Sequence, residues 1–230
     1  MLIILMAVAP WIAQRAWAQP ATDQLLKKVA DIPLPGGASR FDYQSLDPSS
    51  HRLYFSHMGD GELMVFDTSN EKLLAHLPGF PVMTGVLAVP SLKRIYGSVT
   101  KNHEVAVVDA ESLAIIRRIP AGHFPDGLAF CPETLKLYVS DESGGQETVI
   151  DTQTNTNLLS IPLDGEAGNT QYDPVSHLIL VAVQTRNQLV AIDPTVRQNR
   201  RSLRFEDGPA PAWLLRRCRK QPGLHFLSGR

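Results

Sequence analysis

One step of 42 residues recurs along the chain and limits the folds it can adopt more than any other feature. Several kinds of anchor share this step: Pro48, Pro90, Pro132 and Pro174; Tyr54, Tyr96 and Tyr138, with Leu180 in the fourth place; and Asp67, Asp109, Asp151 and Asp193. Independent anchors with one spacing indicate tandem copies of a single structural unit.

Each unit is predicted to contain four short β-strands rich in Val, Ile, Leu and Tyr. In the first unit these are residues 43–46, 52–56, 62–66 and 73–77. The first strands of the successive units are expected to begin near Asp42, Thr84, Asp126 and Asn169. The Asp that ends each third strand can accept a backbone N–H and close a tight turn, so we assign these aspartates to structure.

A four-stranded repeat of this length is the size of one β-propeller blade. The sequence therefore predicts an all-β fold, a β-propeller with four recognisable four-stranded blades. The repeats are placed at about 39–80, 81–122, 123–164 and 165–205, within a propeller region of residues 19–210.

Three segments, Leu53–Ser56, Ile95–Thr100 and Leu137–Asp141, are each followed by a turn and a strand that ends in Asp. They resemble the YVTN-type β-propeller repeat family, which includes bacterial surface-layer and periplasmic propeller proteins. The resemblance covers about residues 39–205, and Tyr138–Asp141 comes nearest to the family's tetrad. It implies the fold and says little about activity, because the family's recurring residues mostly build the blades.

The N-terminal residues are expected to direct export. Leu2–Ala13 is an almost unbroken apolar run, and Ala16–Ala18 has the small-x-small pattern of a signal-peptidase site, although no Lys or Arg precedes the run. We predict a signal peptide at 1–18, a periplasmic or extracellular location, and no membrane span after cleavage.

The two ends of the repeat region do not match each other. Residues 25–34 are predicted to form an outer strand, for which the C-terminal end should supply inner partners. Residues 211–230 instead form a basic tail of net charge +5 without the repeat anchors. We therefore expect an incomplete ring, a truncated or frameshifted family member, and a disordered tail.

Several chemistries leave no signature in the sequence. Cys131 and Cys218 are the only cysteines, so there is no haem-attachment motif and no zinc-binding cysteine pair. Nucleophile-elbow, HExxH and phosphate-loop motifs are absent as well. Residues 19–210 carry 16 basic and 23 acidic side chains, a net charge of −7, which disfavours nucleic-acid binding.

In a propeller, the loops that enter the inner strands and those between the second and third strands open on one face, here called the loop face. The candidate ligand-binding residues on it are Arg40, Asp42, His57, Asp60, His123, Asp126, Asp141, Glu142, Glu166, Asn169, Arg186 and Asn187. Asp42, Asp126, Glu166 and Asn169 supply oxygen ligands that could hold Ca²⁺, or each could cap a turn.

Other candidate residues on the loop face could have more than one role. His57 and His123 could act as a base or a metal ligand, or could have neither role. Arg186 and Asn187 could hold a carboxylate or phosphate. Asp141 and Glu142 are interpreted most simply as part of a solvated hairpin turn.

Three functions remain open at this level. The leading interpretation is a non-catalytic exported module that binds a small molecule, a peptide or a partner protein on its loop face. The alternative is a propeller enzyme, either a metal-dependent lactone-type hydrolase or a periplasmic dehydrogenase subunit, which rests on analogy between folds. The third, single-stranded nucleic-acid binding, needs a basic groove, and the acidic repeat region argues against one.

Overall fold

The computed structural model describes residues 27–195 and 200–204. The chain divides into two compact units, residues 1–33 and 34–230. Within the described part of the first unit, residues 27–33 contain no helix or strand, and Lys28 forms an ion pair with Asp31.

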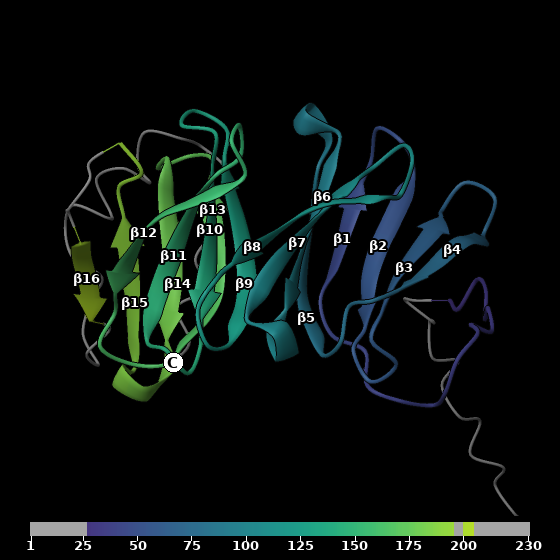
Figure 1. Cartoon of the computed structure of the whole chain (residues 1–230), viewed down its shortest axis with the longest axis horizontal. Coiled ribbons are helices and arrows are strands. Elements are labelled where there is room, and N and C mark those ends of the chain that lie inside the picture. Colours follow the sequence, from purple (N-terminus) through teal and green to yellow (C-terminus); the bar gives the residue numbers. More distant parts are fainter. Residues whose placement is uncertain (1–26, 196–199, 205–230) are drawn as a thin grey trace, which may run out of the picture. The chain divides into compact units, whose positions relative to one another are not determined.

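The second unit consists of antiparallel four-stranded sheets (Figure 1). The first sheet contains β1 (Gln44–Asp47), β2 (Arg52–His57), β3 (Glu62–Asp67) and β4 (Lys72–Pro78). The second contains β5 (Met83–Val89), β6 (Arg94–Val99), β7 (Glu104–Asp109) and β8 (Ile115–Pro120). The third contains β9 (Pro125–Cys131), β10 (Lys136–Asp141), β11 (Gln146–Asp151) and β12 (Thr156–Pro162). The fourth contains β13 (Ala167–Asp173), β14 (Leu178–Val183), β15 (Gln188–Ile192) and β16 (Arg200–Arg204).

These sheets are consecutive blades of an incomplete β-propeller ring, which confirms the predicted fold class. Strands follow chain order within each sheet, and the innermost strands contact one another in the order β1, β5, β9, β13. The only helical turns in the described residues are three short 3₁₀ segments, η1 (Pro90–Leu92), η2 (Thr100–Asn102) and η3 (Gln184–Arg186).

The blades are held together by apolar side chains from facing sheets. Tyr54, Tyr96 and Tyr138 are 1%, 0% and 3% exposed, as expected for side chains between blades. Tyr54 packs with Val86 and Ile95 of the second blade, and the other two tyrosines take the same place in the next two interfaces. The repeated Tyr is therefore a packing residue.

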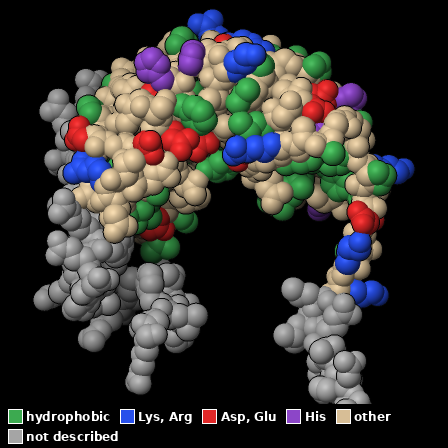
Figure 2. Space-filling model, turned by 90° about the horizontal axis from the view of Figure 1, so that it is seen from below, with side chains coloured by type: hydrophobic (Ala, Val, Ile, Leu, Met, Phe, Trp, Pro, Cys, Tyr) green, Lys and Arg blue, Asp and Glu red, His purple; other side chains and the backbone are tan. Residues whose placement is uncertain are grey.

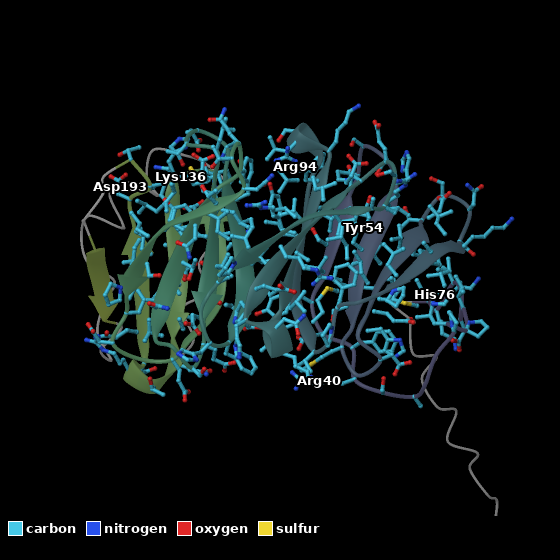
Figure 3. The ribbon with its side chains drawn as sticks, in the orientation of Figure 1. Arg40, Tyr54, His76, Arg94, Lys136 and Asp193 are labelled. Atoms are coloured by element: carbon cyan, nitrogen blue, oxygen red, sulfur yellow. The ribbon has the colours of Figure 1, made fainter. Side chains whose placement is uncertain are left out.

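Polar contacts between blades come from donors that are 42 residues apart, Ser56 and Ser98 at one end of the blades and Arg52 and Arg94 at the other. The buried hydroxyl of Ser56 donates to the carbonyl of Met83, and that of Ser98 donates to the carbonyl of Asp126 at 2.7 Å. At the opposite end of the blades, Arg94 donates to the carbonyl of Thr152 at 2.6 Å; Figure 3 shows it far from Arg40 of the loop face. Such bonds fix the register of one blade against the next.

Each outermost strand of the first three blades carries a β-bulge at the same repeat position. Leu74, Ile116 and Leu158 have no partner in the ladder, and each is 47% exposed. A bulge disrupts the row of backbone N–H and C=O groups that an edge strand offers to other chains. The bulge at this position therefore disfavours pairing of the blade edge with a strand of another molecule.

Bulges in the innermost strands bring neighbouring backbones close together where the loop face begins. The ladder shifts near Gly85 in β5 and near Gly127 in β9. A Cβ at Gly85 would lie 2.0 Å from the carbonyl oxygen of Asp126, and one at Gly127 would lie 2.9 Å from the amide nitrogen of Thr170. Glycine is needed at both positions because adjacent strands approach too closely for a side chain.

Two sequence predictions about the chain ends have different outcomes. Residues 27–34 form no strand, since no partner strand pairs with them among the described residues. The outer strand predicted for 25–34 is therefore not formed there, and residues 25 and 26 lie outside the described part. The predicted signal peptide and basic tail also lie outside it.

Candidate functional site

The loop face contains a hollow of about 610 Å³. Its lining residues come from all four blades: Arg40, Asp42, Tyr43, Met58, Thr84, Phe124, Asp126, Glu142 and Asn169. Figure 2 looks at the molecule from this side and shows acidic side chains gathered close to a basic one.

The repeat explains why these residues meet. Asp42, Thr84 and Asp126 occupy one position of the 42-residue unit, at the entry to an innermost strand. Met58 and Glu142 share a second position, in the turn between the second and third strands. Because both positions face the same end of every blade, substitutions in different repeats change the walls of one hollow.

The hollow is acidic, and its carboxylates influence one another. Burial, followed by the nearby charges of Glu142 and Asp42, raises the pKa of Asp126 to about 6, and hydrogen bonds from Thr84 and Tyr43 offset part of this effect. Burial, followed by Asp126, also raises the pKa of the Tyr43 hydroxyl. Arg40 forms an ion pair of 3.0 Å with Asp42. No Lys or Arg in the described residues forms an ion pair with Asp126 or Glu142.

His57 and Asp60, both predicted site residues, lie in a separate cluster with Ser39. The Ser39 hydroxyl donates to Asp60 at 2.6 Å and lies 2.9 Å from Nε2 of His57. Nδ1 of the buried imidazole has no hydrogen-bond partner, and Phe41 stacks on the ring at 4.2 Å. A catalytic relay needs the carboxylate on Nδ1 and the hydroxyl on Nε2. Here both groups lie on the Nε2 side, so the cluster serves to anchor the loop.

Asp141 differs from the solvated turn residue that the sequence suggested. It is fully buried and accepts hydrogen bonds from the backbone N–H groups of His123 and Phe124, at 3.0 and 2.7 Å. The prediction was wrong because local turn chemistry does not show that the loop entering β9 folds over this carboxylate. His123 is held beside His103, whose Nδ1 lies 2.5 Å from the His123 carbonyl oxygen.

The fourth-blade candidates other than Asn169 lie outside the hollow. Glu166 accepts a hydrogen bond from Gln184, which also donates to Glu142 at 2.8 Å. Arg186 donates to the carbonyl of Leu163 at 3.0 Å. Asn187 has a φ of 50° and terminates η3, at a position where the other repeats also have positive φ. The presence of Asn at this position is thus explained by its tolerance of positive φ.

The proposed calcium set is not brought together. Asp42, Asp126 and Asn169 line the hollow, but Glu166 does not. No group of three or more His, Cys, Asp or Glu side chains in the described part of the chain is spaced to hold a metal ion. The same part contains no helix that is long and apolar enough to cross a membrane.

Five of the predicted residues therefore line the hollow: Arg40, Asp42, Asp126, Glu142 and Asn169. The sequence reasoning missed Tyr43, Met58, Thr84 and Phe124, although each lies in a loop or strand entry that the repeat had located. Aligning the repeats position by position, instead of selecting charged residues, would have found Thr84 and Met58.

The geometry defines a class, the β-propeller, and solved structures share it. Hydrazine synthase from Kuenenia stuttgartiensis is 19% identical with a TM-score of 0.62, over 70% of this chain and 48% of that one. U3-55K and the RRP9 WD40 repeats are each 12% identical with TM-scores of 0.66, over 74% of this chain and 54% and 53% of theirs. Such low identities show the fold alone, and the chain spans about half the length of these structures. No protein-family model and no curated protein sequence matches the chain, so the YVTN resemblance stays a prediction.

Proposed function

We propose that the chain is a binding module whose loop-face hollow accepts an alkylammonium group, from a small amine or from the Lys side chain of a peptide. The observation that carries the proposal is the excess of acid in the hollow. Three carboxylates, Asp42, Asp126 and Glu142, face one guanidinium, that of Arg40, which is already paired with Asp42.

The electrostatic argument concerns Asp126 and Glu142. Their mutual repulsion, together with burial, disfavours the charged form of Asp126. A cation between them would remove that repulsion and pair with both carboxylates. Tyr43 and Phe124 add aromatic surface, which suits a cation with an alkyl chain better than a fully hydrated ion. The hollow has the volume typical of small-molecule sites.

Calorimetric titration tests this proposal directly. We would titrate the full chain with 1,5-diaminopentane and with a short Lys-containing peptide, at pH 7.5 and low salt. The two arms distinguish a small-amine ligand from a peptide ligand. Binding in either arm should weaken at least about tenfold in the double variant Asp126→Asn, Glu142→Gln, since two charge-assisted contacts are lost.

The control is Glu111→Gln, which removes an exposed carboxylate in the β7–β8 turn at the other end of the blades. It has the same type of charge change and should leave affinity unaltered. Equal binding by the double variant and this control would refute the hollow as the site. No measurable heat with either probe would refute the ammonium class of ligand.

We also propose that the protein is exported to the periplasm or the cell exterior. This part rests on the sequence of residues 1–18. N-terminal sequencing of the product from a bacterial host should begin at Gln19. A cytoplasmic product that retains Met1 would contradict it.

A further inference from the structure

The third blade interface, where β11 faces the fourth blade, differs in chemistry from the first two. In the first, Leu63 and Val86 belong to one buried apolar cluster. In the second, Val105 and Leu128 occupy the same repeat positions in another such cluster. In the third, these positions hold Glu147 and Thr170, which are 0% and 6% exposed.

These polar side chains are poorly satisfied. Neither carboxyl oxygen of Glu147 nor the Thr170 hydroxyl has a hydrogen bond of good geometry, and Oε1 of the buried Gln188 has none either. Gln188 lies on the same face of β15 as Val190 and Ile192, which pack against the third blade. An unpaired polar group buried in this way costs free energy, and a charged one costs far more.

Among the side chains that the structure describes, no charged group compensates for the burial of Glu147, and the effect of burial is countered in part by Thr170. On the fourth-blade side of this interface, Val181, Val183 and Val190 belong to the apolar cluster, and the buried polar side chains are Thr170 and Gln188, all uncharged. On the third blade's own side the titratable groups are the Tyr138 hydroxyl and the Cys131 thiol, with the Asp193 carboxylate acting on Tyr138 from the fourth blade. All three are neutral or negative at physiological pH, so none stabilises a carboxylate.

We propose that this interface is a pH-sensitive joint, in which neutral Glu147 packs against Thr170 and ionised Glu147 loosens the fourth blade from the third. Burial raises the pKa of Glu147 well above its usual value, and Thr170 offsets only part of that shift. Loosening would act on the loop face, because Thr170 follows Asn169 of the hollow.

The sign of the effect follows from proton binding. A carboxyl whose pKa is raised by folding binds more protons in the folded than in the unfolded chain. Its contribution is therefore most favourable at low pH and is lost as pH rises from the unfolded value near 4.5 through the folded one. Carboxylates with lowered pKa, such as Asp47 and Asp173, act in the opposite direction. The contribution of Glu147 is therefore measured as the difference in the pH dependence of stability between wild type and a Glu147 variant.

The first experiment measures thermal midpoints of the full chain between pH 5 and pH 8. Glu147→Leu restores the residue found at this position in the first and fourth repeats, Leu63 and Leu189, and Glu147→Gln keeps the shape without titrating. As pH rises, the thermal midpoints of both variants should increase relative to that of wild type, that of Glu147→Leu by about 3 °C or more. Glu111→Gln should follow wild type throughout.

The second experiment locates the effect. Hydrogen exchange, corrected for its intrinsic pH dependence, should show faster opening of β13–β15 peptides at pH 8 than at pH 5 in wild type. Peptides of β2 and β3 should show no such change, and Glu147→Leu should abolish the one in the fourth blade. Parallel pH profiles for wild type and both variants would overturn the proposal, as would a uniform change across all blades.

Discussion

Replacing Tyr96 tests whether blade packing is as tight as the structure indicates. The side chain is fully buried between the second and third blades, among Val107, Leu128 and Leu137. A buried Tyr removes about 200 Å² from water, which at about 25 cal/mol per Å² is worth roughly 5 kcal/mol. Allowing for the alanine methyl and partial collapse of the cavity, Tyr96→Ala should cost roughly 4 kcal/mol.

Tyr96→Phe supplies the matched control. The Tyr96 hydroxyl is buried without a hydrogen bond of good geometry, although Arg94 and Thr152 lie close enough to affect its pKa. Arg94 donates to the Thr152 carbonyl at 2.6 Å and not to the Tyr96 hydroxyl. Removing the hydroxyl should then change the free energy of unfolding by less than about 1 kcal/mol.

The assay is thermal unfolding followed by circular dichroism. For a chain of this size roughly 4 kcal/mol lowers the midpoint by about 8–16 °C. A Tyr96→Ala midpoint close to that of wild type would show that the ring is not a packing residue. A large loss in Tyr96→Phe would show instead that the hydroxyl bond carries the stability.

Two further predictions concern the backbone near the loop face. Gly85→Ala should lower the melting temperature strongly, because the added Cβ would lie 2.0 Å from the Asp126 carbonyl oxygen. Gly168→Ala is the control and should be tolerated, because the atom nearest to its Cβ would be 3.7 Å away. Equal melting temperatures for the two variants would contradict the close approach of β5 and β9. Asp141→Ala should cost more than Asp151→Ala, since the Asp141 side chain is buried and its hydrogen bonds to backbone N–H groups are partly shielded from water, whereas those of Asp151 are exposed. Equal melting points for these two variants would mean that the loop entering β9 is held by other contacts.

The repeat made most of the fold predictable. Anchors such as Pro90, Tyr96 and Asp109 recur because each belongs to a turn or to a contact between blades. Their common spacing can be recognised in the sequence without knowing which distant residues are in contact. Strand bounds follow from that register: β2 was expected at 52–56 and is found at Arg52–His57. The bulges were not predictable, because they depend on how closely neighbouring strands approach.

The site was less predictable than the fold, for a physical reason. Sequence pattern places a residue at one end of a blade but does not show whether it points into the hollow, as Asp126 does, or beneath a loop, as Asp141 does. The burial of Glu147 between two blades could not be predicted for the same reason. Its position in the repeat is apolar elsewhere, and this contrast was the one available signal.

The most direct test of the binding proposal is the titration of Asp126 itself. Carboxyl carbon resonances followed by NMR should show this group titrating near pH 6 in the free protein, because burial, Glu142 and Asp42 disfavour its charge. With saturating 1,5-diaminopentane the midpoint should fall by about one unit or more, since a cation that prefers the ionised form tenfold shifts the pKa by that amount. An Asp126 midpoint that stays near 6 at millimolar diamine would contradict the assignment of the hollow as an ammonium site.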